Sequence, residues 1–140
     1  MTRFLVAVDG SENSFRALER TLKLHKPGDS LLVVHVVETG LLHKAKYMTH
    51  EEVSEMMDNT AQQLVARAEQ LCKDSNAAEA KCQVAKGNDC REKLIRLCEK
   101  NEIDVLVLGS RGSGAVASLL LGSTADHCLN NAHCSVFLVK

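Results

Sequence analysis

Glycine residues concentrate in one window of this chain, at a spacing that suits contact with phosphate. Residues 105–124 read VLVLGSRGSGAVASLLLGST and hold four of the chain's eight glycines: Gly109, Gly112, Gly114 and Gly122. Because glycine has no Cβ, its backbone can come close to an anion, and successive N–H groups can point toward that anion. The window predicts a site for a phosphorylated ligand. The alternative is that these glycines only form turns.

The end of the same window adds a second element that favours anions. Ser123 has the residue type of a helix N-cap, so we expect the last helix to run from Ser123 to about Asn131. The first N–H groups of a helix have no partners inside it, and the helix dipole places partial positive charge there. Phosphate is a favourable ligand for such a helix start.

Two short apolar runs are expected to position these groups. Residues 103–108 precede Gly109, the first glycine of the window, and residues 4–8 precede Asp9. Their length and β-branched content predict buried strands. Ser11 is the expected N-cap of a helix that ends near His25, and residues 31–37 predict the second strand. The chain therefore opens with a right-handed βαβ unit and two parallel strands.

The rest of the chain continues this alternation. Thr49 and Glu52 match a capping box for a helix that ends near Lys73, and residues 38–48 before it are expected to form a loop. Residues 80–84 alternate apolar and polar, which predicts a half-exposed strand at a sheet edge. Asp89 is the expected cap of a third helix, with Glu92 completing a possible capping box, and residues 136–139 predict the fifth strand.

This order predicts an α/β fold: an open five-stranded parallel sheet with helices on both faces. If the strand order is 3-2-1-4-5, the first and fourth strands are neighbours where the order reverses. Ligands bind there, beyond the carboxyl ends of the strands. Asp9 and Gly109 then face one crevice although they are 100 residues apart in the sequence. The topology thus supports a ligand site independently of the glycine window.

Composition excludes several function classes. The chain has 140 residues, 45% of them hydrophobic and 25% charged, with a net charge of −1. The length predicts one domain over residues 1–140, and the charge balance predicts neither nucleic-acid nor membrane binding. The start, MTRFLVAVDG, has too short an apolar segment for a signal peptide, so we expect a cytosolic (cytoplasmic) protein. The six cysteines form no C-x-x-C pair and are expected to be reduced, mostly buried thiols.

The glycine spacing separates three kinds of phosphate-binding loop. A P-loop requires a Gly-Lys pair, and no lysine lies between Lys100 and Lys140. Residues 112–117 match the dinucleotide pattern G-x-G-x-x-G/A, but they follow the fourth strand rather than the first and lack the acidic residue after the next strand. A third pattern, G-x2-G-x9-G-[ST], fits Gly109, Gly112 and Gly122-Ser123.

With this motif the sequence resembles the universal stress protein family, and specifically its ATP-binding branch. The resemblance covers the whole chain and is strongest in LVAVDGS at residues 5–11, HVVE at 35–38, DVLVLGSRG at 104–112 and LLLGSTADHCLNNAHCSVFLV at 119–139. It implies a Rossmann-like fold of the adenine nucleotide alpha-hydrolase-like type, and it implies ATP or AMP as the ligand, with Mg²⁺ as a candidate companion ion.

The resemblance also implies roles for individual residues. Asp9 and Val36 would contact adenine and ribose, above a floor formed by Ala7 and the adjacent Val8. Leu108 and Gly109 would line the ribose side. The physical chemistry agrees, since a carboxylate suits ribose hydroxyls or an adenine amine.

The phosphates would lie over the glycine window. Gly112 and the backbone near Ser113 would meet them, and Gly122, Ser123 and Thr124 would complete the nest at the helix start. Backbone and hydroxyl donors hold anions in this way. Arg111 would add charge, but it is the weakest candidate because its family position varies.

The family also implies a homodimer that pairs through the last strand. Members often have Pro-Val at the start of that strand, where this chain has Ser135-Val136. The change adds one backbone N–H donor, so it should not prevent pairing. The dimer is implied by the resemblance and is not shown by the sequence alone, which indicates no other protein partner.

Several single residues have simpler explanations. Asp9 could only cap the first turn, and His35 in an apolar strand is expected to be a core histidine with a hydrogen-bond partner. Met56 and Met57 are expected on the core face of their helix. The pairs His127-Cys128 and His133-Cys134 do not converge on one helix, so we expect no metal site.

Three functions remain open on the sequence. The first is a nucleotide-binding stress-response module that acts as a dimeric switch or binds a partner. The second is a slow ATP hydrolase of the same fold, and the third is a partner-binding, flavodoxin-like domain with an empty nucleotide site. Asp9 is the only acid that we expect near the site, so we assign no catalytic residue and expect ATP hydrolysis to be slow or absent.

Overall fold

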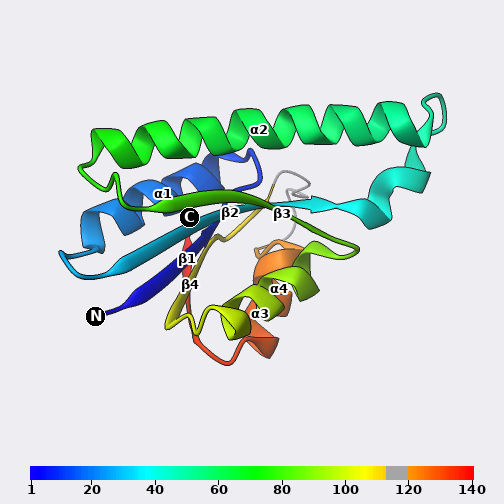
Figure 1. Cartoon of the computed structure of the whole chain (residues 1–140). Coiled ribbons are helices and arrows are strands. Elements are labelled where there is room, and N and C mark those ends of the chain that lie inside the picture. The colour runs from blue at the N-terminus through cyan, green and yellow to red at the C-terminus, as the bar shows by residue number, and fades with distance from the viewer. Residues whose placement is uncertain (113–119) are drawn as a thin grey trace.

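Five parallel strands form an open sheet in this computed structural model, which describes residues 1–112 and 120–140 (Figure 1). The strands run in the order β3-β2-β1-β4-β5, as the sequence predicted. Their bounds are β1 Arg3–Ala7, β2 Ser30–Glu38, β3 Lys81–Gly87, β4 Val105–Gly109 and β5 Ser135–Val139. The central strand β1 pairs Leu5 with Leu32 of β2 and with Leu106 of β4, so the strand order reverses between β1 and β4.

Helices cover both faces of the sheet. The helices α1 Glu12–Leu24 and α2 His50–Asp74 lie over one face, and α3 Cys90–Lys100 and α4 Ser123–Asn131 lie over the other (Figure 1). Successive strand residues point to opposite faces. Phe4 and Val6 of β1 therefore pack toward Phe15 of α1, and Leu5 packs toward Leu94 of α3. This arrangement explains why the central strands are apolar at nearly every position.

The helix starts follow the predicted caps with one exception. Ser11 and Thr49 cap α1 and α2, and Glu52 completes the capping box with Thr49. Asp89 caps α3 by accepting from the N–H of Arg91. The prediction that Ser123 caps α4 is wrong: Gly122 is the N-cap, and Ser123 is the first helical residue. Gly122 has an extended backbone, and its N–H donates to the carbonyl of Ser110. The N-cap of α4 therefore lies at Gly122, one residue before the expected position.

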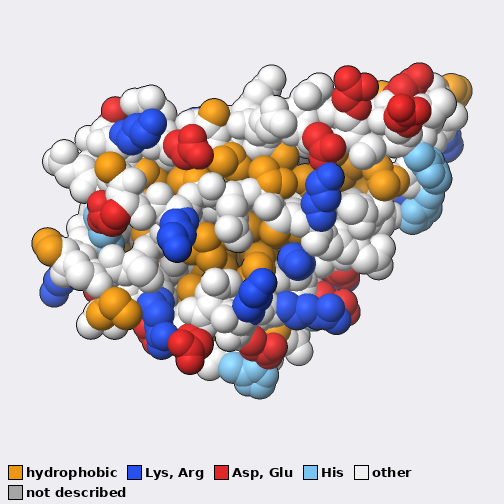
Figure 2. All heavy atoms as spheres, viewed as in Figure 1, with side chains coloured by type: hydrophobic (Ala, Val, Ile, Leu, Met, Phe, Trp, Pro, Cys, Tyr) orange, Lys and Arg blue, Asp and Glu red, His pale blue; other side chains and the backbone are white. Residues whose placement is uncertain are grey.

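The two edges of the sheet differ from its centre. As predicted, β3 is an edge strand, with an exposure that alternates along most of its length. Apolar side chains are visible between α2 and the sheet in the space-filling view, amid charges of both signs (Figure 2). The opposite edge is β5, where Phe137 is exposed.

The segment after β2 is not the irregular loop that we expected. Residues Thr39–Lys44 form a short 3₁₀ helix, η1. The hydroxyl of Thr39 donates to the carbonyl of Gly87 at 3.2 Å, and the N–H of Gly40 donates to the carbonyl of Asn88 at 3.1 Å. These contacts come from the β3–α3 connection, which lies far away in sequence, so local periodicity could not indicate them.

The length and composition of a helix determine whether it could cross a membrane. At 25 residues, α2 is the longest described helix, and its sequence is rich in charged and polar side chains. None of the helices in the described part of the chain combines the length and the apolar composition that a membrane crossing requires.

Candidate functional site

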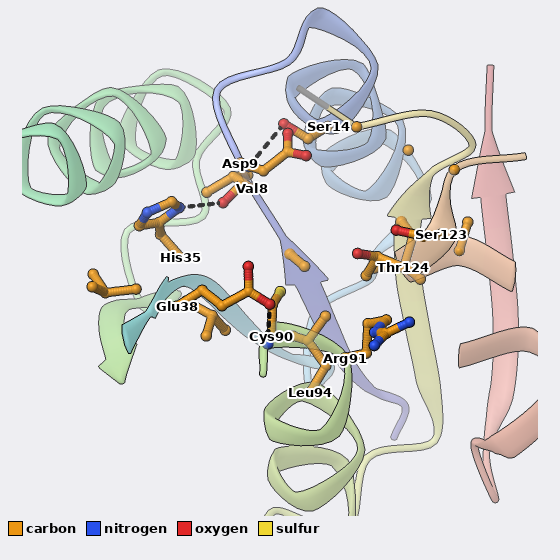
Figure 3. Close-up of a pocket in the computed structure, with 18 of the residues that line it drawn as sticks. Val8, Asp9, Ser14, His35, Glu38, Cys90, Arg91, Leu94, Ser123 and Thr124 are labelled. Atoms are coloured by element: carbon orange, nitrogen blue, oxygen red, sulfur yellow. Dashed lines mark hydrogen bonds between the residues drawn. The ribbon is translucent and has the colours of Figure 1, made fainter. Parts of the chain in front are cut away.

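A cavity of about 790 Å³ opens at the carboxyl ends of β1, β2 and β4, where the strand order reverses (Figure 3). Its floor consists of residues that end these strands, and α2, α3 and the start of α4 supply its walls. This is the position in which open parallel sheets bind ligands, and the volume is in the usual range for small-molecule sites.

The residues that the sequence singled out come together around this cavity. Asp9 at the end of β1 lies on the same cavity as Gly109 at the end of β4. Ser113 lies outside the described residues. The other candidate residues all line the cavity: Ala7, Val8, Asp9, Val36, Leu108, Gly109, Arg111, Gly112, Gly122, Ser123 and Thr124. Their roles toward a ligand remain predictions.

The two ends of the glycine window are tied together by hydrogen bonds. The N–H of Gly122 donates to the carbonyl of Ser110 at 2.8 Å, and the N–H of Ser110 donates to the carbonyl of Val139 in β5 at 2.8 Å. These bonds hold the start of α4 beside the end of β4. In the described structure no side chain caps α4, so the partial positive charge at its start faces the cavity beside Ser123 and Thr124 (Figure 3).

Asp9 supports the start of α1 and also borders the glycine window. Its Oδ1 accepts from the N–H of Ser11 at 2.9 Å and from the hydroxyl of Ser11 at 2.6 Å. Ser11, rather than Asp9, is the N-cap of α1. A Cβ added to Gly112 would lie 2.7 Å from Oδ2 of Asp9. Because Gly112 has no Cβ, the backbone of the glycine window can lie close to this carboxylate.

Two polar side chains of β2 line the cavity with defined partners. The Nδ1 of His35 hydrogen-bonds to the carbonyl of Val8 at 2.8 Å, which confirms that this half-buried histidine has a partner (Figure 3). The Oε1 of Glu38 accepts from the N–H of Cys90 at 3.0 Å and so binds the first residue of α3. Burial raises the pKa of the Cys90 thiol to about 12, so this thiol is neutral in the cavity wall at physiological pH.

Among the described residues, three Lys or Arg side chains line the cavity: Lys44, Arg91 and Arg111. The Nη2 of Arg91 donates to Oδ2 of Asp89 at 2.8 Å, and this hydrogen bond lowers the pKa of Asp89 to about 2. Arg91 is thereby held at the start of α3 with its charge partly balanced. Arg111 and Lys44 line the same cavity from the glycine window and from η1. Three different segments, α3, the glycine window and η1, therefore contribute a cationic residue to the lining.

Some lining residues were missed or misassigned on the sequence. The prediction that Met56 and Met57 belong to the core is wrong: Met56 is 51% exposed, Met57 is half-buried, and both line the cavity. The buried positions of α2 are Val53, Ala61, Ala68 and Cys72. The methionines lie where α2 extends past the carboxyl end of the sheet and lines the cavity. The helical period predicts which way they point, but it does not show that a cavity lies there instead of packed core.

The lining also contains one more acid than expected. Glu38 joins Asp9, and both carboxylates already accept hydrogen bonds from the protein. The position of Glu38 at the end of β2 could have indicated this acid from the sequence, because side chains at that end of a strand face the crevice. Within residues 1–112 and 120–140, no three His, Cys, Asp or Glu side chains lie close enough to share a metal ion.

The sheet order and the cavity at its reversal define a Rossmann-like α/β protein. The chain belongs to the universal stress protein family, whose family model matches residues 1–140.

Curated relatives carry the same family name. A universal stress protein of Methanocaldococcus jannaschii is 24% identical over 143 residues, with 99% of this chain and 81% of the relative covered. One of Thermus aquaticus is 30% identical over 145 residues, with 97% and 96% covered. Other relatives are longer: the match spans 60% of one from Arabidopsis thaliana and 46% of one from Mycobacterium tuberculosis.

Solved structures show the same fold. The universal stress protein UspA from Lactobacillus plantarum superposes with a TM-score of 0.84 at 22% identity, with 99% of this chain and 97% of that chain covered. A universal stress protein from Archaeoglobus fulgidus in complex with dAMP gives 0.72 at 18%, with 100% and 98% covered. A family protein from Arabidopsis thaliana with AMP bound gives 0.67 at 22%, with 100% and 92% covered.

Proposed function

We propose that this protein binds an adenine nucleotide, ATP or AMP, in the cavity at the ends of β1, β2 and β4. One observation carries the proposal: a cavity of about 790 Å³ joins a helix start, a close-approach glycine at Gly112 and the carboxylate of Asp9. The first two features suit phosphates, and the third suits ribose or adenine. The AMP and dAMP complexes of two proteins with the same fold support the choice of ligand.

The lining suggests how the nucleotide would lie. The apolar ends of the strands, including Val36 and Leu108, would contact the base and the ribose. The phosphates would extend toward Gly112 and the start of α4, with Arg111 nearby. Binding or release of the nucleotide would then act on α4 and, through the bond between Ser110 and Val139, on the edge strand β5. In this proposal the bound state changes the affinity for a second copy or a protein partner.

Slow or absent hydrolysis follows from the same lining. Hydrolysis requires a positioned water and, in most enzymes, a metal held by a carboxylate. Asp9 and Glu38 are the carboxylates of the described lining, and each already supports the start of a helix. Neither is therefore placed as a dedicated metal ligand. We propose a binder, in which ATP persists far longer than in an ATPase.

Mass spectrometry of small molecules released from freshly purified, denatured protein tests the ligand. We expect an adenine nucleotide at a substantial fraction of the protein concentration. Protein purified empty is titrated with ATP and AMP, with and without Mg²⁺, and failure to bind either nucleotide would overturn the proposal. Phosphate release that depends on a divalent ion and turns over the bound ATP would instead favour the slow hydrolase.

We further propose that residues 1–140 act as one cytoplasmic domain that forms a homodimer through β5. The outer edge of β5 offers backbone groups and the exposed Phe137 to a second copy. The extra N–H that Ser135 contributes donates to the carbonyl of Asp104 at 3.1 Å. It is therefore used inside the chain and does not disturb pairing at the outer edge.

Lysine substitutions at the two sheet edges test the dimer. The Phe137→Lys variant places a charge on the proposed interface and should halve the apparent mass measured by light scattering after gel filtration. Val84→Lys is the matched control, because Val84 is exposed to a similar extent, 38% against 44%, on the opposite edge strand β3. A monomeric wild-type protein, or a dimer that only Val84→Lys disrupts, would contradict pairing through β5.

A further inference from the structure

Two cysteines form a pair at the end of the sheet opposite the nucleotide cavity. Cys72 lies in the last turn of α2, and Cys82 is the second residue of the edge strand β3. The side chains of Cys72 and Cys82 line the same small cavity beside the edge strand. The two side chains also pack in the same apolar cluster on this face of the sheet. A shared cavity and a shared apolar cluster place the two side chains next to each other.

The connection between the two elements holds this pair in place. The carbonyl of Cys72 accepts from the N–H of Ala77 at 2.8 Å and from the N–H of Ser75 at 3.3 Å. Asn76 adopts the left-handed conformation with φ of 58°, which reverses the chain direction. The N–H of Ala80 then donates to the carbonyl of Ala77 at 3.0 Å and leads into β3. The turn therefore holds the end of α2 beside the start of β3.

A small oxidant can reach the pair. Cys72 and Cys82 line one cavity of about 280 Å³ together with Glu69, Lys73, Ala78 and Ala80. Glu69, Lys73 and Ala78 are exposed, so the cavity opens to solvent. A water molecule occupies about 30 Å³ in the liquid, so the cavity has room for hydrogen peroxide, which is only slightly larger. Cys72 itself is 2% exposed, which restricts access to small reagents.

The pKa values of the Cys72 and Cys82 thiols are shifted in opposite directions, so the two thiols suit different steps of disulfide formation. The hydrogen bond from Cys82 lowers the pKa of the Cys72 thiol, whereas the same bond raises the pKa of Cys82. Burial of Cys72 and the nearby Glu69 and Glu79 act in the opposite direction, but less strongly than this bond. Burial raises the pKa of Cys90, Cys98 and Cys128. Since the thiolate is the nucleophile, Cys72 is the preferred site of attack on a peroxide among these four thiols.

We propose that Cys72 and Cys82 form a peroxide-oxidisable dithiol, whose disulfide links the end of α2 to the edge strand β3. In the first step the Cys72 thiolate attacks one oxygen of hydrogen peroxide, the O–O bond breaks, and after protonation water leaves and Cys72 is a sulfenic acid. In the second step the sulfur of Cys82 attacks the sulfur of Cys72 and loses its proton. The sulfenic hydroxyl leaves as water. Two thiols are oxidised and one peroxide is reduced to two waters.

A second cysteine pair provides an internal comparison. Cys98 in α3 and Cys134, just before β5, pack in one apolar cluster. This pair lies on the other face of the sheet, and Cys98 is buried. Burial raises the pKa of Cys98, so attack by this thiol on peroxide is disfavoured. Limiting peroxide should therefore distinguish the two pairs within one molecule.

Tryptic mapping of the reduced full chain tests the proposal. The protein is treated with limiting hydrogen peroxide, quenched with catalase, denatured, alkylated with N-ethylmaleimide and digested. Trypsin cleaves after Arg67, Lys73, Lys81 and Lys86, so the two cysteines fall in separate peptides, 68–73 and 82–86. We expect these peptides cross-linked, with a mass lower by two hydrogens than their sum, and two of the six cysteines protected from alkylation. Reduction with dithiothreitol should restore both peptides.

Two variants and one competing product decide the outcome. Cys82→Ser should abolish the cross-link and leave the sulfenic acid on Cys72, which a dimedone-type probe detects. Cys90→Ser is the matched control and should retain the cross-link at the wild-type yield. If Cys98 and Cys134 cross-link first, or if Cys72 and Cys82 are both alkylated after peroxide treatment, the proposal is wrong.

Discussion

The Gly112→Val variant should lose nucleotide binding while it keeps its fold. A Cβ at this position would lie 2.7 Å from Oδ2 of Asp9, so the valine side chain enters the space between the glycine window and the carboxylate. In the proposed complex the phosphates lie against Gly112, so the larger side chain would also compete with them for this part of the cavity. We expect the dissociation constant of ATP to rise at least about a hundredfold, equivalent to about 2.8 kcal/mol.

The design of this experiment separates loss of binding from loss of structure. The contact made by the added Cβ is the end of one exposed side chain, Asp9, and not the backbone of another element. The urea midpoint of Gly112→Val should therefore remain close to that of the wild type. Isothermal titration with ATP measures affinity in the same preparation. If the folded Gly112→Val protein binds ATP with wild-type affinity, the proposed position of the phosphates is wrong.

The Gly109→Ala variant should lose stability. A Cβ at Gly109 would lie 2.8 Å from the carbonyl carbon of Asn13 and 2.9 Å from the backbone nitrogen of Ser14. Both are backbone atoms of the first turn of α1, which the hydroxyl of Ser11 caps by accepting from the N–H of Ser14 at 3.2 Å. Neither atom can yield unless α1 moves away from β4. Overpacking of this kind costs about 1–3 kcal/mol.

Urea unfolding of Gly109→Ala measures this cost, and Gly112→Ala is the matched control. Both substitutions add one methyl group to a glycine of the same motif, but only the one at Gly109 meets backbone. We expect a clear fall in the urea midpoint for Gly109→Ala and a change within about 0.5 kcal/mol for Gly112→Ala. Equal midpoints for the two variants would show that α1 can shift freely. We therefore expect Gly109 to serve the fold and Gly112 to serve the proposed site.

Much of the architecture was predictable because local signals agreed with one another. Apolar runs such as residues 4–8 and 103–108 indicated buried strands, and the caps at Ser11 and Thr49 gave the helix starts. Alternation of strands and helices requires parallel pairing and right-handed crossovers, so few topologies remain. The strand boundaries differ from the predicted ones by one to a few residues, because β-pairing depends on the neighbouring strand as well as on local composition.

The candidate site was predictable at the strand ends and less so at its walls. Asp9, Gly109 and Gly122 follow from motif spacing and from the rule that ligands bind where the strand order reverses. Met56 and Arg91 reach the cavity only through the packing of α2 and α3 on opposite faces of the sheet. The helical period gives the direction of a side chain, but it does not reveal whether the helix at that point covers the core or overhangs a cavity.

The sequence by itself determined the strand–helix order, the parallel sheet and the family motif, because these depend on residue type and spacing along the chain. The tertiary structure alone decided that Gly109 faces the backbone of α1, that Gly112 faces Asp9, and that Cys72 meets Cys82. Each of these facts is a contact between atoms brought together by the packing of different elements. Composition and periodicity describe one segment at a time, so they contain no information about such contacts.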